Sequence, residues 1–224
     1  MSQRLLFPDS DAATDALTFA GRTARLGDGG VRLQAARGTL AMTSAPLAPR
    51  GLFDTTPTVL AMRALPVDPE LECDLVVDPT LLTRADDEPH AVVLPEVALS
   101  PAWAGIAPPR GGWEAAGGIE ASVLASRAQY GIAAVAEAMP ADPGEDVVRT
   151  VRAGIWGAPD DALGGLPLGT AFAAFALGFI AGEEEAVVRR VGAWTRVSLR
   201  RGHVLVRGPV RSGLTAVRET GAPL

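Results

Sequence analysis

Two groups of side chains in this 224-residue sequence have types and spacing suited to binding chemistry. The first is a short segment in which Trp103 and Trp113 flank Arg110 and are followed by Glu114. Aromatic faces beside a guanidinium can stack a flat ligand or hold an anion. The doubled prolines and glycines of the same segment would hold it in a rigid shape. We therefore treat these four residues as a candidate ligand-binding site. The competing interpretation is a strap whose tryptophans fill a seam between two parts of the protein.

The second group is a run of arginines near the C-terminus, where acidic residues are scarce. A basic β-hairpin can follow phosphates, and a tryptophan on it can stack on a base. The candidate nucleic-acid-binding residues are Trp194, Arg196, Arg200, Arg201, His203 and Arg207. The competing interpretation is a solvated or salt-bridged face that meets acids of the first part of the chain. His203 falls in the expected turn, where a histidine is more often an ordinary polar residue than a general base.

Several common catalytic chemistries lack their residues here. The sequence contains no lysine, which excludes a Schiff-base or P-loop lysine. With one cysteine and two histidines, a zinc site of the Cys/His type could form only by adding carboxylates. The linear motifs of metalloproteases, serine hydrolases and dinucleotide-binding folds are also missing. We predict no catalytic residue, no metal and no cofactor. A carboxylate-dependent hydrolase stays an alternative, because 26 acids could pair in space without a linear pattern.

Composition indicates a folded chain with a sizeable core. Hydrophobic residues make up 48% of it, which argues against disorder. A net charge of −6 provides no overall attraction to nucleic acid or anionic lipid, so nucleic acid is the weaker partner class. A single cysteine, Cys73, gives no sign of an oxidising compartment. The N-terminus does not resemble a signal peptide, and the apolar stretch 166–181 is shorter than the roughly 20 residues that span a bilayer. We expect a cytoplasmic protein without a membrane partner.

The periodicity of apolar residues predicts an α+β fold with an N-terminal helix and a mostly antiparallel sheet, followed by a helical part that ends in a β-hairpin. We expect three segments: a sheet domain over 1–97, a Pro/Gly/Trp-rich connection over 98–117 and a helical domain over 118–224. In the first domain we predict a helix at 9–26, strands at 31–36, 39–44, 58–65, 72–77 and 91–94, and a short helix at 80–85. In the second we predict helices at 119–139, 145–156 and 166–181, another opening at 183–185, and strands at 194–199, 204–207 and 215–218.

Three segments of the sequence resemble a family of uncharacterised proteins from high-GC actinobacteria. They are Gly-Gly-Val-Arg-Leu-Gln-Ala at 29–35, Pro-Pro-Arg-Gly-Gly-Trp-Glu at 108–114 and Arg-Gly-His-Val-Leu-Val-Arg at 201–207. The resemblance covers nearly the whole chain. It implies a bacterial cytoplasmic origin and says nothing about catalytic residues.

These observations favour a non-enzymatic binding or regulatory protein that works through a surface between its two parts. Its partner would be a small molecule or another protein. Nucleic-acid binding by the arginine-rich hairpin and carboxylate-dependent hydrolysis are the alternatives. The apolar second part is also compatible with a homodimer, although the sequence indicates no pairing surface.

Overall fold

The computed structural model describes residues 3–27, 29–51 and 53–208 and shows the α+β fold expected from the sequence. Its α-helices are α1 (Ser10–Ala24), α2 (Ala121–Ala138), α3 (Glu145–Gly157) and α4 (Gly169–Ala176). Its strands are β1 (Arg4–Leu6), β2 (Val31–Ala36), β3 (Thr39–Leu47), β4 (Thr58–Pro66), β5 (Cys73–Val77), β6 (Thr83–Arg84), β7 (Ala91–Val93), β8 (Glu114–Glu120), β9 (Pro159–Asp160), β10 (Leu166–Pro167), β11 (Glu185–Val191), β12 (Trp194–Leu199) and β13 (Gly202–Arg207). Three 3-10 turns complete it: η1 (Pro79–Leu81), η2 (Ala102–Gly105) and η3 (Asp161–Leu163).

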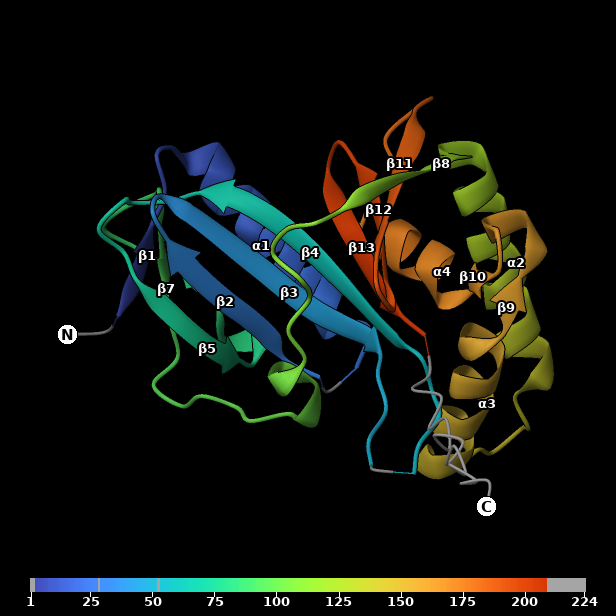
Figure 1. Ribbon diagram of the computed structural model, residues 1–224. Coiled ribbons are helices and arrows are strands. Elements are labelled where there is room, and N and C mark those ends of the chain that lie inside the picture. Colours follow the sequence, from blue (N-terminus) through green and yellow to red (C-terminus); the bar gives the residue numbers. More distant parts are fainter. Residues whose placement is uncertain (1–2, 28, 52, 209–224) are drawn as a thin grey trace, which may run out of the picture.

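One eight-stranded antiparallel sheet joins the two parts of the chain (Figure 1). Its strand order is β5-β2-β3-β4-β13-β12-β11-β8. The first four strands come from the first part and the last four from the second. They meet where Thr58–Met62 of β4 pairs with His203–Arg207 of β13. Because backbone hydrogen bonds cross this junction, the two parts form one continuous layer.

Local sequence signals explain how the first elements begin and turn. Asp9 caps α1, since its carboxylate accepts a hydrogen bond of 2.8 Å from the backbone N–H of Ala12. Strands β2 and β3 form the expected hairpin. Its turn places Arg37 and Gly38 at positive φ, 51° and 76°, the conformation required at both central residues of the tightest hairpin turns.

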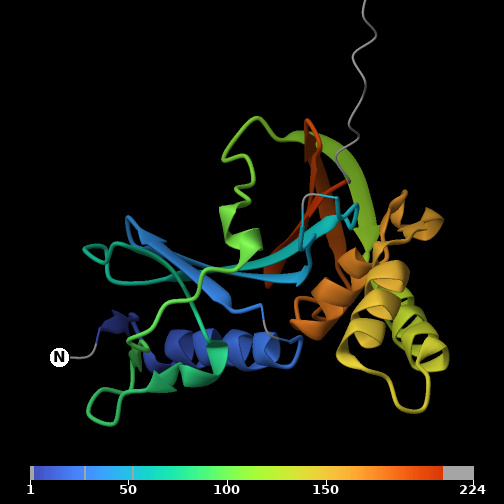
Figure 2. The same ribbon diagram turned by 90° about the horizontal axis from the view of Figure 1, so that it is seen from below.

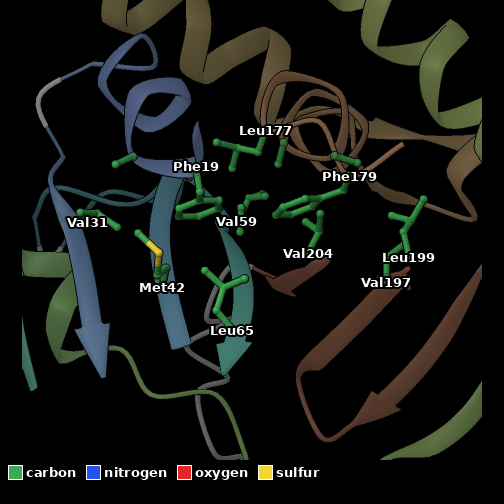
Figure 3. Close-up of a cluster of buried hydrophobic side chains, with 14 of the residues drawn as sticks. Phe19, Val31, Met42, Val59, Leu65, Leu177, Phe179, Val197, Leu199 and Val204 are labelled. Atoms are coloured by element: carbon green, nitrogen blue, oxygen red, sulfur yellow. The ribbon is translucent and has the colours of Figure 1, made fainter. Parts of the chain in front are cut away.

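The helices and the connection lie on opposite sides of the sheet (Figure 2). Helices α1 and α4 cover one face, and between them and the strands lies the main core (Figure 3). There Phe19 of α1 stacks on Phe179, which follows α4, with ring centroids 6.2 Å apart. Residues 98–113, called the strap below, cross the other face. The strap covers a second, smaller cluster of Leu60, Val76, Trp103, Trp194 and Leu205.

Three predicted elements differ in the structure, and a fourth cannot be compared with it. The segment at 183–185 opens strand β11 instead of a helix, because Ala186 and Val188 alternate with exposed residues at a period of two. The apolar stretch 166–181 holds only the short helix α4, which ends before Gly178, a residue at positive φ. The helix expected at 80–85 is the 3-10 turn η1 followed by strand β6. The strand predicted at 215–218 lies outside the described residues.

The predicted connection 98–117 is partly structured. It contains η2, and its last four residues already belong to β8 at the edge of the sheet. The second part therefore contributes four strands, β8, β11, β12 and β13, to the large sheet in addition to its helices. In the part of the chain that the structure describes, no helix is long and apolar enough to cross a membrane.

Candidate functional site

A pocket of about 900 Å³ lies where the two parts of the chain meet, and we call it the seam pocket. Its walls come from the end of α1, the loop between β3 and β4, the beginning of the strap and one face of α3. They are lined by Thr23, Leu26, Gly27, Gly29, Gly30, Ser44–Arg50, Asp54–Pro57, Pro101–Trp103, Glu145, Val148–Thr150, Arg152–Gly154 and Trp156–Ala158.

An irregularity in the sheet opens this space. The pairing of β3 with β4 shifts between Ser44, which lies opposite Ala61, and Leu47, which lies opposite Val59. Pro46 lies within the shift and has no N–H to donate to the ladder. A bulge of this kind redirects the side chains beside it.

Two buried tryptophans form apolar walls of the pocket. Trp103 is 6% exposed, and its indole Nε1 donates a hydrogen bond of 2.7 Å to the carbonyl of Gly29. Trp156 is 3% exposed and stacks on Phe172 with ring centroids 4.3 Å apart. Each ring is held by a contact with another residue, so the apolar walls are largely preformed.

Two residues that line the pocket have buried hydroxyl groups without hydrogen-bond partners in the described structure. They are Oγ1 of Thr23 at the end of α1 and Oγ of Ser44 on β3. Burial of a hydroxyl without a hydrogen bond costs about 1–3 kcal/mol. A ligand that supplies a donor or acceptor at this point would recover that cost.

The charged groups of the pocket are held by the protein. Arg152 donates to the carbonyl of Leu26 at 3.2 Å. Arg149 forms ion pairs with Glu145 and Asp146 on its own helix. Hydrogen bonds from Thr56 and then from the Arg50 backbone lower the pKa of Asp54.

The lowered pKa of Asp54 does not suit the general acid of the hydrolase alternative, because a general acid needs a raised pKa. Among the residues that the structure describes, no group of three or more His, Cys, Asp or Glu side chains could hold a metal ion.

The four residues predicted around the strap are not brought together. Only Trp103 lines the seam pocket. Trp113 is half-buried and donates its Nε1–H to the carbonyl of Pro109 at 3.1 Å. Arg110 is exposed, and Glu114 is exposed at the beginning of β8. The strap therefore contributes one wall of a pocket instead of a complete site.

The residues predicted to bind nucleic acid on the arginine-rich hairpin do not form one site either. Trp194 is 7% exposed beneath the strap and cannot serve as a stacking platform for a base. Arg200 is an exposed turn residue that lies 3.6 Å from the carboxylate of Glu184, and the carbonyl of Arg201 accepts a hydrogen bond from Arg63. By contrast, Arg196, His203 and Arg207 lie on one face of the sheet.

Most residues of the seam pocket carry no recognisable sequence signal. Thr23, Ser44 and Trp156 lie far apart in the chain and become neighbours only through the fold. The proline-rich segment 45–51 marks a loop. The sequence of this segment does not show that the loop faces α3.

Comparisons with protein families identify the two parts separately. A domain of unknown function (DUF8010) matches residues 1–105, and a second domain of unknown function (DUF8185) matches residues 108–211. The two matches adjoin within the strap. A search of curated proteins finds no match.

Solved structures with a similar fold are DNA polymerase III beta subunits. A protein assigned as this subunit from Eubacterium rectale has a TM-score of 0.50 and 7% identity, covering 92% of this chain and 64% of its own. The sliding clamp of Caulobacter crescentus has a TM-score of 0.47 and 13% identity, covering 99% and 69%. The sliding clamp of Bartonella birtlesii bound to griselimycin has a TM-score of 0.49 and 11% identity, covering 93% and 65%. The chain thus spans about 64% of the length of the Eubacterium rectale protein, and at this identity the likeness concerns the fold alone.

Proposed function

We propose that this chain is a cytoplasmic binding protein whose seam pocket takes a small organic ligand. One observation carries the proposal: the pocket of about 900 Å³ is lined by Thr23 and Ser44, whose buried hydroxyls have no hydrogen-bond partner among the described residues. Small-molecule sites usually measure about 300–1,000 Å³ and combine apolar walls with a few placed polar groups. The seam pocket has both features.

The walls indicate the chemistry of the ligand. Trp103 and Trp156 offer apolar contact, and the two hydroxyls can each donate or accept one hydrogen bond. Among the described residues Arg152 donates one hydrogen bond, to the carbonyl of Leu26, and its remaining N–H groups are suited to an anionic or carbonyl oxygen. We infer a ligand with a flat or branched apolar body and polar groups at one end.

The test begins with a metabolite library screened by thermal shift and by ligand-observed NMR. Confirmed ligands are then titrated into the wild type and into Thr23→Val and Ser44→Ala. Loss of one hydrogen bond of about 1 kcal/mol weakens binding roughly fivefold. Thr170→Val is the matched control, because Oγ1 of Thr170 is also buried and unpartnered but does not line the seam pocket.

The affinities of the variants distinguish a ligand-binding site from a space that binds no ligand. Weaker binding in Thr23→Val and Ser44→Ala but not in Thr170→Val supports the proposal. If the ligands bind all variants alike, or if no metabolite binds, the small-molecule assignment is wrong.

A further inference from the structure

Strands β11, β12 and β13 bring four polar side chains together on the face of the sheet that the strap crosses. Arg189 of β11 lies directly opposite Arg196 of β12. Two residues after Arg196 on β12, Ser198 lies opposite His203 of β13. Side chains alternate between the two faces of a strand, so these four share one face. We call them the arginine face.

Two like charges directly opposite each other destabilise a sheet unless an opposite charge lies nearby. The acids on this face of β11 and β8 are Glu185 and Glu120, which lie opposite each other, and neither forms an ion pair with the two arginines within the described part of the chain. Neither Arg189 nor Arg196 forms an ion pair or donates a side-chain hydrogen bond there. Glu185, the acid on the same face of β11, lies against Gly118 instead.

Arg196 is held in place without its hydrogen bonds being satisfied. Its guanidinium lies over the ring of Trp113, 4.7 Å from the ring centroid. Its Nε is buried and has no hydrogen-bond partner among the described residues. Burial, and then the charge of Arg189, lower the pKa of Arg196, which is the effect of a cation near another cation without a counter-charge.

His203 adds a third basic group beside this pair. Its Nδ1 lies 3.0 Å from Oγ of Ser198. Burial lowers its pKa, and the charges of Arg196 and Arg189 lower it further. An anion that offsets the two arginines would raise the pKa of His203 from this lowered value.

We propose that the arginine face is a binding site for a tetrahedral oxyanion, the phosphate group of a small molecule, held by Arg189, Arg196, His203 and Ser198. A guanidinium fork matches the spacing of phosphate oxygens, and a serine hydroxyl adds one more donor. The site shares no residue with the seam pocket. A nucleic-acid strand fits less well, because Trp194 is buried under the strap and offers no stacking surface.

NMR of the two histidines tests this proposal directly, since His203 and His90 are the only ones in the sequence. The His203 signal is followed against pH in sulfate, whose charge stays constant over this range, and in chloride of equal ionic strength. The expected result is a higher pKa of His203 in sulfate than in chloride. Equal His203 titrations in the two salts overturn the proposal.

Variants then show which arginines act. We expect Arg189→Gln to weaken sulfate binding about tenfold, since it removes a charge-assisted pair, and to raise the pKa of His203 without sulfate. Arg190→Gln is the matched control: it removes the same charge one residue away, on the opposite face of β11. Equal weakening by the two variants means nonspecific attraction and contradicts the site. Arg196→Gln with wild-type affinity contradicts it as well.

Further probes distinguish the possible ligands. Inorganic phosphate and phenyl phosphate are titrated at one pH, and both should compete with sulfate. Tighter binding of phenyl phosphate assigns the site to a phosphate monoester, whereas equal affinity assigns it to the free anion. A single-stranded oligonucleotide that binds far more tightly, and loses affinity in Arg190→Gln as in Arg189→Gln, overturns the small-molecule site in favour of nucleic acid.

Discussion

Gly131 of α2 lies directly against the indole of Trp156 of α3. A Cβ at position 131 would come within 2.1 Å of Cζ3 of that ring and 2.9 Å of Cδ2 of Leu168. Trp156 in turn stacks on Phe172 of α4 and lines the seam pocket. A missing side chain on one helix therefore sets the position of a pocket wall on another.

We expect Gly131→Ala to destabilise the protein. The added methyl would overlap a rigid ring, and overpacking of this kind costs about 1–3 kcal/mol. The free energy of unfolding in urea measures the change. Gly21→Ala is the matched control, because Gly21 lies within α1 and a Cβ there meets nothing within 4 Å. That variant should be stabilised by up to about 1 kcal/mol. A loss in Gly21→Ala equal to that in Gly131→Ala contradicts the packing argument.

The hydrogen bond from Trp103 to the carbonyl of Gly29 should anchor the strap to the sheet. Trp103→Phe keeps an aromatic ring and removes the donor, which is expected to cost about 1–2 kcal/mol. Trp113→Phe should cost less, because Nε1 of Trp113 bonds only to Pro109, four residues away. Urea unfolding measures both losses, and limited proteolysis within 98–113 should become faster only in Trp103→Phe. Unchanged cleavage there would show that the bond does not anchor the strap.

His203 should make stability depend on pH in the neutral range. Burial and two arginines lower its pKa in the folded protein below the ordinary value of about 6.5. Its neutral form then favours folding above that value, and this contribution is lost as the pH falls through the folded pKa. Urea unfolding at pH 8 and pH 5 should therefore show a smaller loss of stability in His203→Gln than in the wild type. Identical losses would contradict the assignment.

The hydrogen bonds of Asp74 should contribute to stability over a different pH range from that of His203. Its carboxylate accepts two hydrogen bonds from Arg32, 2.7 and 2.8 Å long, and these lower its pKa. The contribution is present above the unfolded value of about 3.9 and is lost as the pH falls through the lower folded value. Asp74→Asn should be less stable than the wild type at pH 6, with the difference shrinking towards pH 3. The effect should be modest because the pair is partly exposed. A constant difference across this range would assign the loss to another cause.

Sequence by itself determined the elements whose signals are local. The β2–β3 hairpin follows from alternating apolar residues around Arg37-Gly38, and α1 follows from its cap and its apolar face. The class of fold follows from the same periodicities, because a period of two or of 3.6 depends only on neighbouring residues. The helix predicted to open at 183–185 was wrong for the converse reason. Acidic residues suit a helix start, but pairing with β12 and β8 makes the segment from Glu185 a strand.

Only the tertiary structure decided where the candidate sites lie. The seam pocket joins Thr23, Ser44 and Trp156, which are separated by many residues, and no local pattern relates them. The residues predicted around Trp103 do not form one site because the two tryptophans contact different residues. Trp103 donates a hydrogen bond to Gly29, and the ring of Trp113 lies against the guanidinium of Arg196. Strand register likewise set Arg189 opposite Arg196. Register depends on which strands pair, and pairing is settled by burial across the whole sheet.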